Sequence, residues 1–135
     1  MSRLPTISLI SNWTVDYFEA DTASLYEFMS SENVPSLANW AFDRRRTEGW
    51  LAWLQKKFDL PVMNNVECMN YVLEIDYVPY GAALVINGRE FGAVQTPFRM
   101  DVTDFIALED NRIAFRVANT EGAFQGIRLV AVPCE

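Results

Sequence analysis

Histidine is absent from this 135-residue sequence. It is the commonest general base near neutral pH and the commonest metal ligand, so its absence argues against the most frequent catalytic and metal centres. The sequence also lacks a glycine-rich phosphate loop, a GxSxG motif and a pair of cysteines at metal-binding spacing. We therefore predict a protein that is not an enzyme and that carries neither a metal ion nor a cofactor.

Cysteine is scarce, since the chain has two, Cys68 and Cys134, and they lie far apart. Secreted proteins held together by disulfides have many more cysteines for their length. We expect reduced thiols in a cytoplasmic protein, with one long-range disulfide as the alternative. The first residues, MSRLPTISLISNW, have a broken apolar run and no small-residue cleavage site, which is not the pattern of a signal peptide.

Basic residues are outnumbered, with 11 lysines and arginines against 18 acidic residues and a net charge of −7. Nucleic-acid binding needs clustered cations to neutralise phosphates. The run Arg44-Arg45-Arg46 is short and is flanked by Asp43 and Glu48, which favours a solvated loop. No apolar stretch approaches the roughly 20 residues of a membrane-spanning helix. We expect neither a nucleic acid nor a membrane as a partner.

Hydrophobic residues make up 50% of the chain and include nine phenylalanines, five tyrosines and four tryptophans. A chain of this length and composition fits one globular domain with a substantial core. No linker, internal repeat or low-complexity tract divides it. Residues 1–135 are therefore expected to form a single domain.

Short segments of alternating polar and apolar residues recur along the chain and are typical of half-buried β-strands. The clearest runs from Tyr71 to Tyr77, where Glu74 and Asp76 alternate with apolar residues. Further segments lie at 13–17, 83–86, 89–91, 98–102, 113–117 and 127–131. This spacing predicts an all-β fold, an antiparallel β-sandwich of the jelly-roll type. The core is expected to contain Leu73, Ile75, Val85, Phe98, Ile113, Phe115, Val117 and Leu129.

Two segments are ambiguous. Asp21 can cap a short helix that reaches Met29. The segment Trp50–Phe58 fits either an amphipathic helix, which periodicity slightly favours, or a strand that ends before Pro61. Between them, residues 30–49 form the longest expected loop, and long loops in compact domains are often functional.

An ordered set of turns follows residue 86. Asn87-Gly88 suits a type I′ hairpin because both residues tolerate positive φ. The side-chain oxygens of the Asp101-Val102-Thr103 turn can accept hydrogen bonds from backbone N–H groups before a short helical turn. The complete order is Asn87-Gly88, Gly92, Pro97-Phe98, Asp101-Val102-Thr103 and Asn111-Arg112-Ile113.

This order resembles the N-terminal sugar-binding domain of glycoside hydrolase family 2, a jelly-roll of the galactose-binding-like kind. The resemblance covers Trp53 to Asn119, with a weaker match at Trp13, and it favours the strand for Trp50–Phe58. Leu54 departs from the pattern, which usually has an aromatic residue there. In the family the chemistry belongs to a separate barrel, for which 135 residues leave no room. Related domains serve as carbohydrate-binding modules, so the resemblance implies glycan binding without catalysis.

Candidate glycan-binding residues are aromatic and cationic side chains in or beside the long loop, because sugar rings stack their C–H faces on aromatic planes. The predicted site consists of Trp40, Arg44, Arg46, Trp50 and Tyr80. Burial in the core, or an ordinary turn in the case of Tyr80, is the competing interpretation of these residues. Trp13 and Trp53 lie in strand patterns, and we assign both to packing.

The alternative function is a structural or interaction domain that associates with itself, or serves as an accessory subunit, without binding sugar. Trp40, Phe42 and Trp50 lie where burial in the monomer is least assured, and exposed apolar surface usually marks a binding face. We therefore expect a homodimer or a higher homo-oligomer. Glu74 and Asp76 share one strand face, and we interpret them as solvated surface rather than as a catalytic pair. We also interpret the oxygen-rich turn at 109–111 as a solvated turn rather than as a calcium site.

Overall fold

A computed structural model describes residues 6–19, 32–42, 50–60, 68–79, 81–118 and 123–134. The described secondary structure consists of β-strands and two short 3-10 helices. The strands are β1 (Thr6–Ser8), β2 (Ser11–Glu19), β3 (Glu32–Ser36), β4 (Trp50–Phe58), β5 (Met69–Tyr77), β6 (Ala83–Ile86), β7 (Arg89–Ala93), β8 (Phe98–Asp101), β9 (Asn111–Ala118) and β10 (Gln125–Pro133). The 3-10 helices are η1 (Leu37–Asn39) and η2 (Thr103–Phe105).

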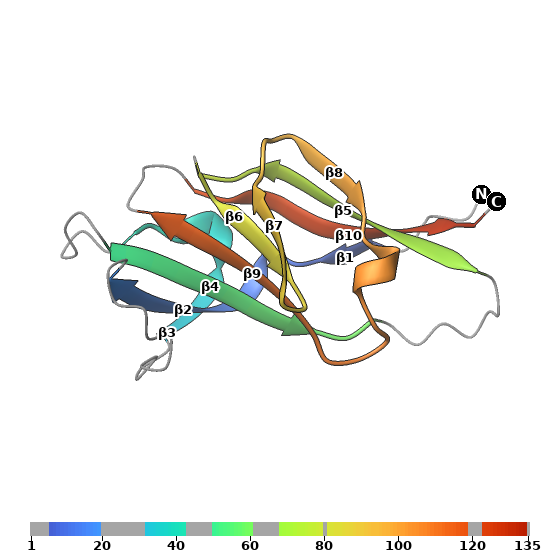
Figure 1. The fold of residues 1–135 in the computed structure, drawn as a ribbon, viewed down its shortest axis with the longest axis horizontal. Coiled ribbons are helices and arrows are strands. Elements are labelled where there is room, and N and C mark those ends of the chain that lie inside the picture. Colours follow the sequence, from blue (N-terminus) through green and yellow to red (C-terminus); the bar gives the residue numbers. More distant parts are fainter. Residues whose placement is uncertain are drawn as a thin grey trace.

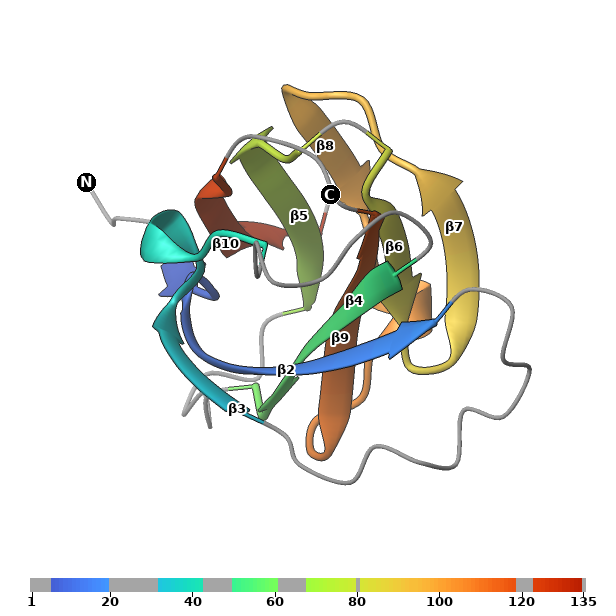
Figure 2. The same cartoon turned by 90° about the vertical axis from the view of Figure 1, so that its left-hand side faces the viewer.

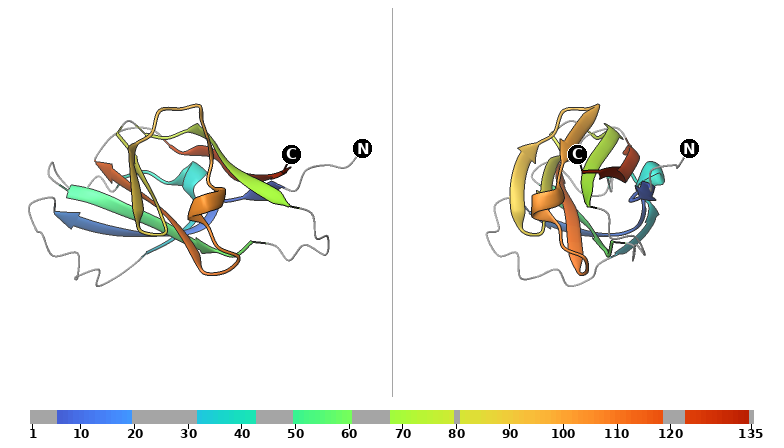
Figure 3. Two further views of the ribbon diagram at one scale, coloured as in Figure 1. Left: turned by 45° about the vertical axis from the view of Figure 1, so that its right-hand side comes forward. Right: turned by 90° about the vertical axis from the view of Figure 1, so that its right-hand side faces the viewer.

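Two antiparallel sheets pack face to face (Figure 1). One has four strands in the order β1-β10-β5-β8, and the other has six in the order β3-β2-β4-β9-β6-β7. Seen end-on, the six-stranded sheet curves from β7 round to β3 and encloses the core with the four-stranded sheet (Figures 2 and 3). The prediction of an all-β antiparallel sandwich of the jelly-roll type is confirmed. Among the described residues, no helix has the length and apolar character needed to cross a membrane.

The core lies between the sheets and is lined by every second residue of the long strands, as the period of two requires. Phe115 on β9 is fully buried between two other aromatic rings, 5.7 Å from Trp13 and 5.0 Å from Phe124. Trp13 donates its indole N–H to the Leu9 carbonyl oxygen at 2.6 Å, so its one polar group is satisfied inside the core. Of the predicted core residues, the buried ones are Leu73, Ile75, Ile113, Phe115, Val117 and Leu129.

Three predicted packing positions differ from the expectation. Phe98 is half-buried and packs against the edge of the core. Val85 is also half-buried, because Leu84 and Ile86 are the residues of β6 that face inward. Trp53 is half-buried and lies on the outer face of the six-stranded sheet, since it alternates with Ala52 and Leu54, which are fully buried.

The segment Trp50–Phe58 is a strand, β4, as the resemblance favoured over the helical periodicity. It lies in the middle of the six-stranded sheet, where it pairs with β2 on one side and β9 on the other. The hairpin between β6 and β7 also follows the prediction, with φ of 49° at Asn87 and 82° at Gly88. Positive φ at both residues is the condition for a type I′ turn.

The Asp101–Thr103 turn forms the hydrogen bonds expected from its side chains. Asp101 Oδ1 accepts from the Thr103 backbone N–H at 2.9 Å and from the Thr103 hydroxyl at 2.6 Å. Thr103 Oγ1 in turn accepts from the backbone N–H of Tyr71 at 2.8 Å, which ties the turn to β5. The short helical turn that follows is η2.

The expectation of reduced thiols is wrong. Cys68 and Cys134 form a disulfide that joins the residue before β5 to the residue after β10. The two strands pair along their whole length, up to Pro133 opposite Met69, so the cysteines that flank this pair are brought together. Disulfides persist mainly in oxidising compartments. The thiol argument for a cytoplasmic location therefore no longer holds.

Candidate ligand-binding site

Trp40 is positioned by a short turn that follows the edge strand β3. Ser36 caps η1 by accepting the Ala38 N–H on its Oγ at 3.2 Å. Leu37 is fully buried, and its backbone N–H donates to the Ile10 carbonyl at 2.8 Å. These two contacts turn the chain back towards the sandwich immediately before Trp40.

This turn buries two aromatic residues of the long loop whose burial was least assured from the sequence. Trp40 is 8% exposed and Phe42 is 6% exposed, so burial in the core, the competing interpretation of Trp40, is what the structure shows. Trp40 packs 6.2 Å from Phe42 and 6.1 Å from Phe124, and Phe42 lies edge-on to Tyr17 at 5.2 Å. The aromatic cluster extends the core to one edge of the six-stranded sheet.

A pocket of about 450 Å³ opens beside this cluster, between β2, β3 and η1. Its size lies within the range of small-molecule sites. Tyr17 and Trp40 supply aromatic surface, and Glu32, Asn33 and Asn39 supply polar groups. The three polar side chains are exposed and make no hydrogen bond or ion pair within the described parts of the chain. They are therefore available to a ligand.

The sequence identified Trp40 but not the other residues of the pocket. Tyr17 shares the strand face of Trp13 and Val15, so alternation alone placed it among packing residues. Asn33 and Asn39 had no sequence signal, because the pocket exists only when β3 pairs with β2 and η1 turns back.

The other predicted site residues do not join Trp40 in this pocket. Trp50 is half-buried, packs against the core and begins β4 opposite Glu19; it is not among the residues that line the pocket. Arg44, Arg46 and Tyr80 lie outside the described residues, as does the segment from Asp21 to Met29.

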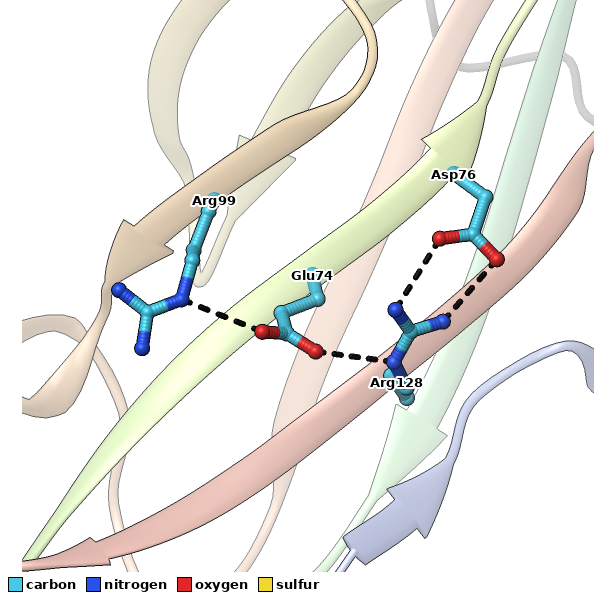
Figure 4. Close-up of polar contacts among 4 residues, drawn as sticks. All are labelled: Glu74, Asp76, Arg99 and Arg128. Carbon is cyan, nitrogen blue, oxygen red and sulfur yellow. Dashed lines mark hydrogen bonds and ion pairs between the residues drawn. The ribbon is translucent and has the colours of Figure 1, made fainter.

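The carboxylates of Glu74 and Asp76 lie on the outer face of the four-stranded sheet in a chain of ion pairs (Figure 4). Glu74 contacts Arg99 at 3.1 Å and Arg128 at 2.9 Å, and Arg128 also binds both oxygens of Asp76. The hydrogen bond from Arg128 lowers the pKa of Asp76, which makes this carboxyl a poor proton donor. The glycine at position 126 leaves room for the Asp76 carboxylate, because a Cβ atom at this position would collide with it.

The turn at 109–111 is used for structure. Asn111 is fully buried, and its amide bonds the backbone of Ala107, while the Asp110 N–H donates to Asp59 Oδ1 at 2.8 Å. Among the residues that the structure describes, no group of three or more acidic or cysteine side chains is placed to hold a metal ion.

No protein-family model matches the chain, and no curated protein matches its sequence. Solved structures do match. A β-glucuronidase from Faecalibacterium prausnitzii is 15% identical with a TM-score of 0.72, over 98% of this chain and 32% of that one. A β-glucuronidase from Bacteroides uniformis is 16% identical with a TM-score of 0.70, over 97% and 18%. A glycosyl hydrolase family 2 member from Bacteroides cellulosilyticus is 15% identical with a TM-score of 0.65, over 94% and 20%.

The chain therefore spans only a part of each of these three proteins, between 18% and 32% of their length. At such low identity the likeness carries the fold and not the activity. The chain resembles one small β-sandwich domain of the glycoside hydrolase family 2 enzymes, as the order of its turns predicted.

Proposed function

We propose that this protein binds a glycan in the pocket beside Trp40 and does not catalyse a reaction on it. One observation carries the proposal: a pocket of about 450 Å³ joins two aromatic side chains to amide and carboxylate groups that have no partner among the described residues. A sugar ring has apolar C–H faces and a rim of hydroxyls. Aromatic surface suits the faces, while asparagine and glutamate side chains suit the rim because they donate and accept hydrogen bonds.

The non-catalytic part of the proposal rests on the state of the carboxylates. Hydrolysis of a glycoside uses two carboxyl groups, one of which holds a proton. Glu74 and Asp76, the pair that shares a strand face, are both engaged by arginine side chains, and the pKa of Asp76 is lowered by Arg128. The similar enzymes are also several times longer than this chain.

The experiment is a binding titration in which tryptophan fluorescence is the signal that reports binding. The probes are methyl glycosides of glucose, galactose, rhamnose and glucuronic acid, the last two because the similar structures include a rhamnosidase and β-glucuronidases. Asn33→Ala and Asn39→Ala each remove one hydrogen-bonding group, and we expect affinity to fall roughly fivefold to tenfold. Gln95→Ala, an exposed position outside the pocket, is the matched control.

Absence of a saturable signal with every glycoside, or equal affinity in all three variants, would contradict glycan binding at this pocket. The alternative, an interaction domain, has one observation in its favour: Leu108 is 76% exposed, which is unusual for a large apolar side chain. Under that alternative, the molar mass in light scattering rises with protein concentration and Leu108→Ser abolishes the rise. The homo-oligomer expected from the sequence is part of this alternative.

A further inference from the structure

Trp53 is the tryptophan that the core does not use. Its neighbours on β4, Ala52 and Leu54, are fully buried, so Trp53 lies on the outer face of the six-stranded sheet, where it is half-buried. The indole N–H of Trp13 is bonded inside the core, whereas that of Trp53 has no acceptor in the described part of the chain. A tryptophan that is partly exposed on the outer face of a sheet, with an indole N–H that no described residue binds, offers both a stacking surface and a donor to a ligand.

Small residues beside Trp53 leave a cavity in the surface of the sheet. The cavity measures about 70 Å³ and is lined by Trp53, Ala83, Leu84, Val85, Glu90, Gly92 and Arg116. Gly92 has φ of 77° and pairs with Leu84 next to a register shift between β6 and β7. Such bulges often lie beside functional sites, because they change the direction of neighbouring side chains.

Two unpaired charges of opposite sign border the cavity. Arg116 is opposite Trp53 in the register of β4 and β9, and Glu90 is opposite Val85 on β7. Both side chains are exposed, and neither forms an ion pair or hydrogen bond with another described residue. On the four-stranded sheet, by contrast, Arg99 and Arg128 are both paired with carboxylates. The unpaired donor, the unpaired acceptor and the indole therefore surround one small depression.

We propose that Trp53, Arg116 and Glu90 form a second sugar-binding site that holds a single sugar residue. The apolar face of the ring stacks on the indole, its hydroxyls accept from Arg116 and donate to Glu90, and one exocyclic group enters the cavity. A volume of about 70 Å³ suits a hydroxymethyl group rather than a whole ring. Arg116 and Glu90 together carry no net charge, and the whole chain carries a net charge of −7, so the site favours a neutral sugar over a uronic acid.

This site is independent of the pocket beside Trp40. Trp53 projects from the outer face of the six-stranded sheet, whereas Val15, which lines the first pocket, is buried on the inner face. The two proposals can therefore fail separately. A site with one stacking ring and two charged groups binds a monosaccharide weakly, with a Kd of roughly millimolar order.

The test follows the indole N–H signals of the four tryptophans in a ¹⁵N-correlation spectrum. The uniformly labelled protein is titrated with methyl β-glucopyranoside and, separately, with glucuronic acid. We expect the Trp53 signal to shift saturably with the neutral glycoside and at least several-fold more weakly with the acid. Arg116→Ala and Glu90→Ala should each weaken the neutral interaction about tenfold. Gln55→Ala, on the same face of β4 but outside the cavity, is the control.

Trp53→Phe keeps a ring on the strand and is the variant least able to disturb the fold. It should retain the native spectrum, and the backbone amide signals of Arg116 and Glu90, which replace the lost indole signal as the readout, should respond to the glycoside more weakly than in the wild type. The Trp40 signal reports the first pocket in the same experiment. A Trp53 signal that does not respond to the glycoside overturns the proposal. So does a signal that moves with protein concentration instead, which would assign this face to a contact between copies of the chain.

Discussion

Asn111 shows how a single polar residue fixes one end of the sandwich. It is fully buried at the start of β9, where asparagine rarely lies without partners. Its Oδ1 accepts from the backbone N–H of Ala107 at 2.7 Å and from Asn87 Nδ2 at 3.0 Å, and its Nδ2 donates to the Ala107 carbonyl at 2.8 Å. Asn87 Oδ1 accepts the Arg112 N–H at 2.8 Å, so two asparagines connect the β6–β7 turn to β9.

We predict that Asn111→Ala lowers the free energy of unfolding by about 1–3 kcal/mol, because it removes these bonds from a fully buried position and takes away the partners of the Ala107 backbone and of the Asn87 side chain. Urea denaturation followed by fluorescence measures the change. Asn111→Asp keeps the acceptor but loses the donor, and an intermediate loss is expected. A change below about 0.5 kcal/mol for Asn111→Ala, the range of an ordinary surface substitution, would contradict the role of this network.

The sequence predicted the position of Asn111 but not its partners. The order of turns placed it at a strand entry, whereas its bonds to Asn87 and Ala107 depend on distant segments meeting. Trp40 is a second case in which distant segments decide the outcome. Its loop position made it a candidate binding residue with burial as the alternative, and η1 directs it back to Phe124, which lies far away in the sequence. Burial of loop residues depends on such contacts and has no local pattern.

At the scale of elements, the sequence predicted where the strands lie, but it predicted which side of each strand faces the core in only some cases. Where polar residues alternate, as in β5, the inward face follows directly from the sequence. The run Ala83-Leu84-Val85-Ile86 has no polar residue to set its phase, and Val85 was placed inward by mistake. The phase is set by β9, because Leu84 pairs with Phe115 and Ile86 with Ile113, and paired residues share a face.

The disulfide stabilises the pair formed by β5 and β10. It closes a loop between cysteines 66 positions apart, which restricts the unfolded chain. We predict that the double variant Cys68→Ala with Cys134→Ala loses about 2–4 kcal/mol of unfolding free energy, and that dithiothreitol lowers wild-type stability by a similar amount. Urea denaturation with and without reductant measures both. The double variant should not respond to reductant, which makes it the control.

A thiol assay provides the sharper check of the bond itself. Protein purified without reductant should have no thiol that reacts with Ellman's reagent after unfolding, because both cysteines are in the bond. Two reactive thiols per chain would show that the disulfide does not form, and the expectation of reduced cysteines would then return.

At the scale of the whole molecule, the fold could be derived from the sequence further than the function could. Alternation and turn order define the sandwich because both act over a few residues. The pocket beside Trp40 and the cavity beside Trp53 are each assembled from three or more elements. Their chemistry also depends on which charges remain unpaired, and pairing is decided between neighbouring strands, as Arg128 on β10 shows by binding both Glu74 and Asp76 on β5.

The acidic character of the whole molecule leads to a prediction about pH. Hydrogen bonds from Arg128 lower the pKa of Asp76, and hydrogen bonds from Thr103 lower that of Asp101. A carboxyl whose pKa is lower in the folded state favours folding while it is ionised, and this contribution is lost as the pH falls below about 4. The melting temperature should therefore be nearly constant from neutral pH to about pH 5 and fall below about pH 4.

Two variants separate this effect from general acid destabilisation. Asp101→Asn should flatten the fall, since its side chain no longer titrates. Asp104→Asn is the matched control, because it changes an exposed aspartate of the adjacent turn whose side chain forms no hydrogen bond with another described residue. Solubility is a distinct property with its minimum near the sequence pI of about 4.5, where the net charge vanishes. Differential scanning fluorimetry at low protein concentration measures the melting temperature without interference from precipitation, so the loss of stability is separated from the loss of solubility. Identical acid profiles for Asp101→Asn and Asp104→Asn would contradict a specific contribution from the Asp101–Thr103 turn.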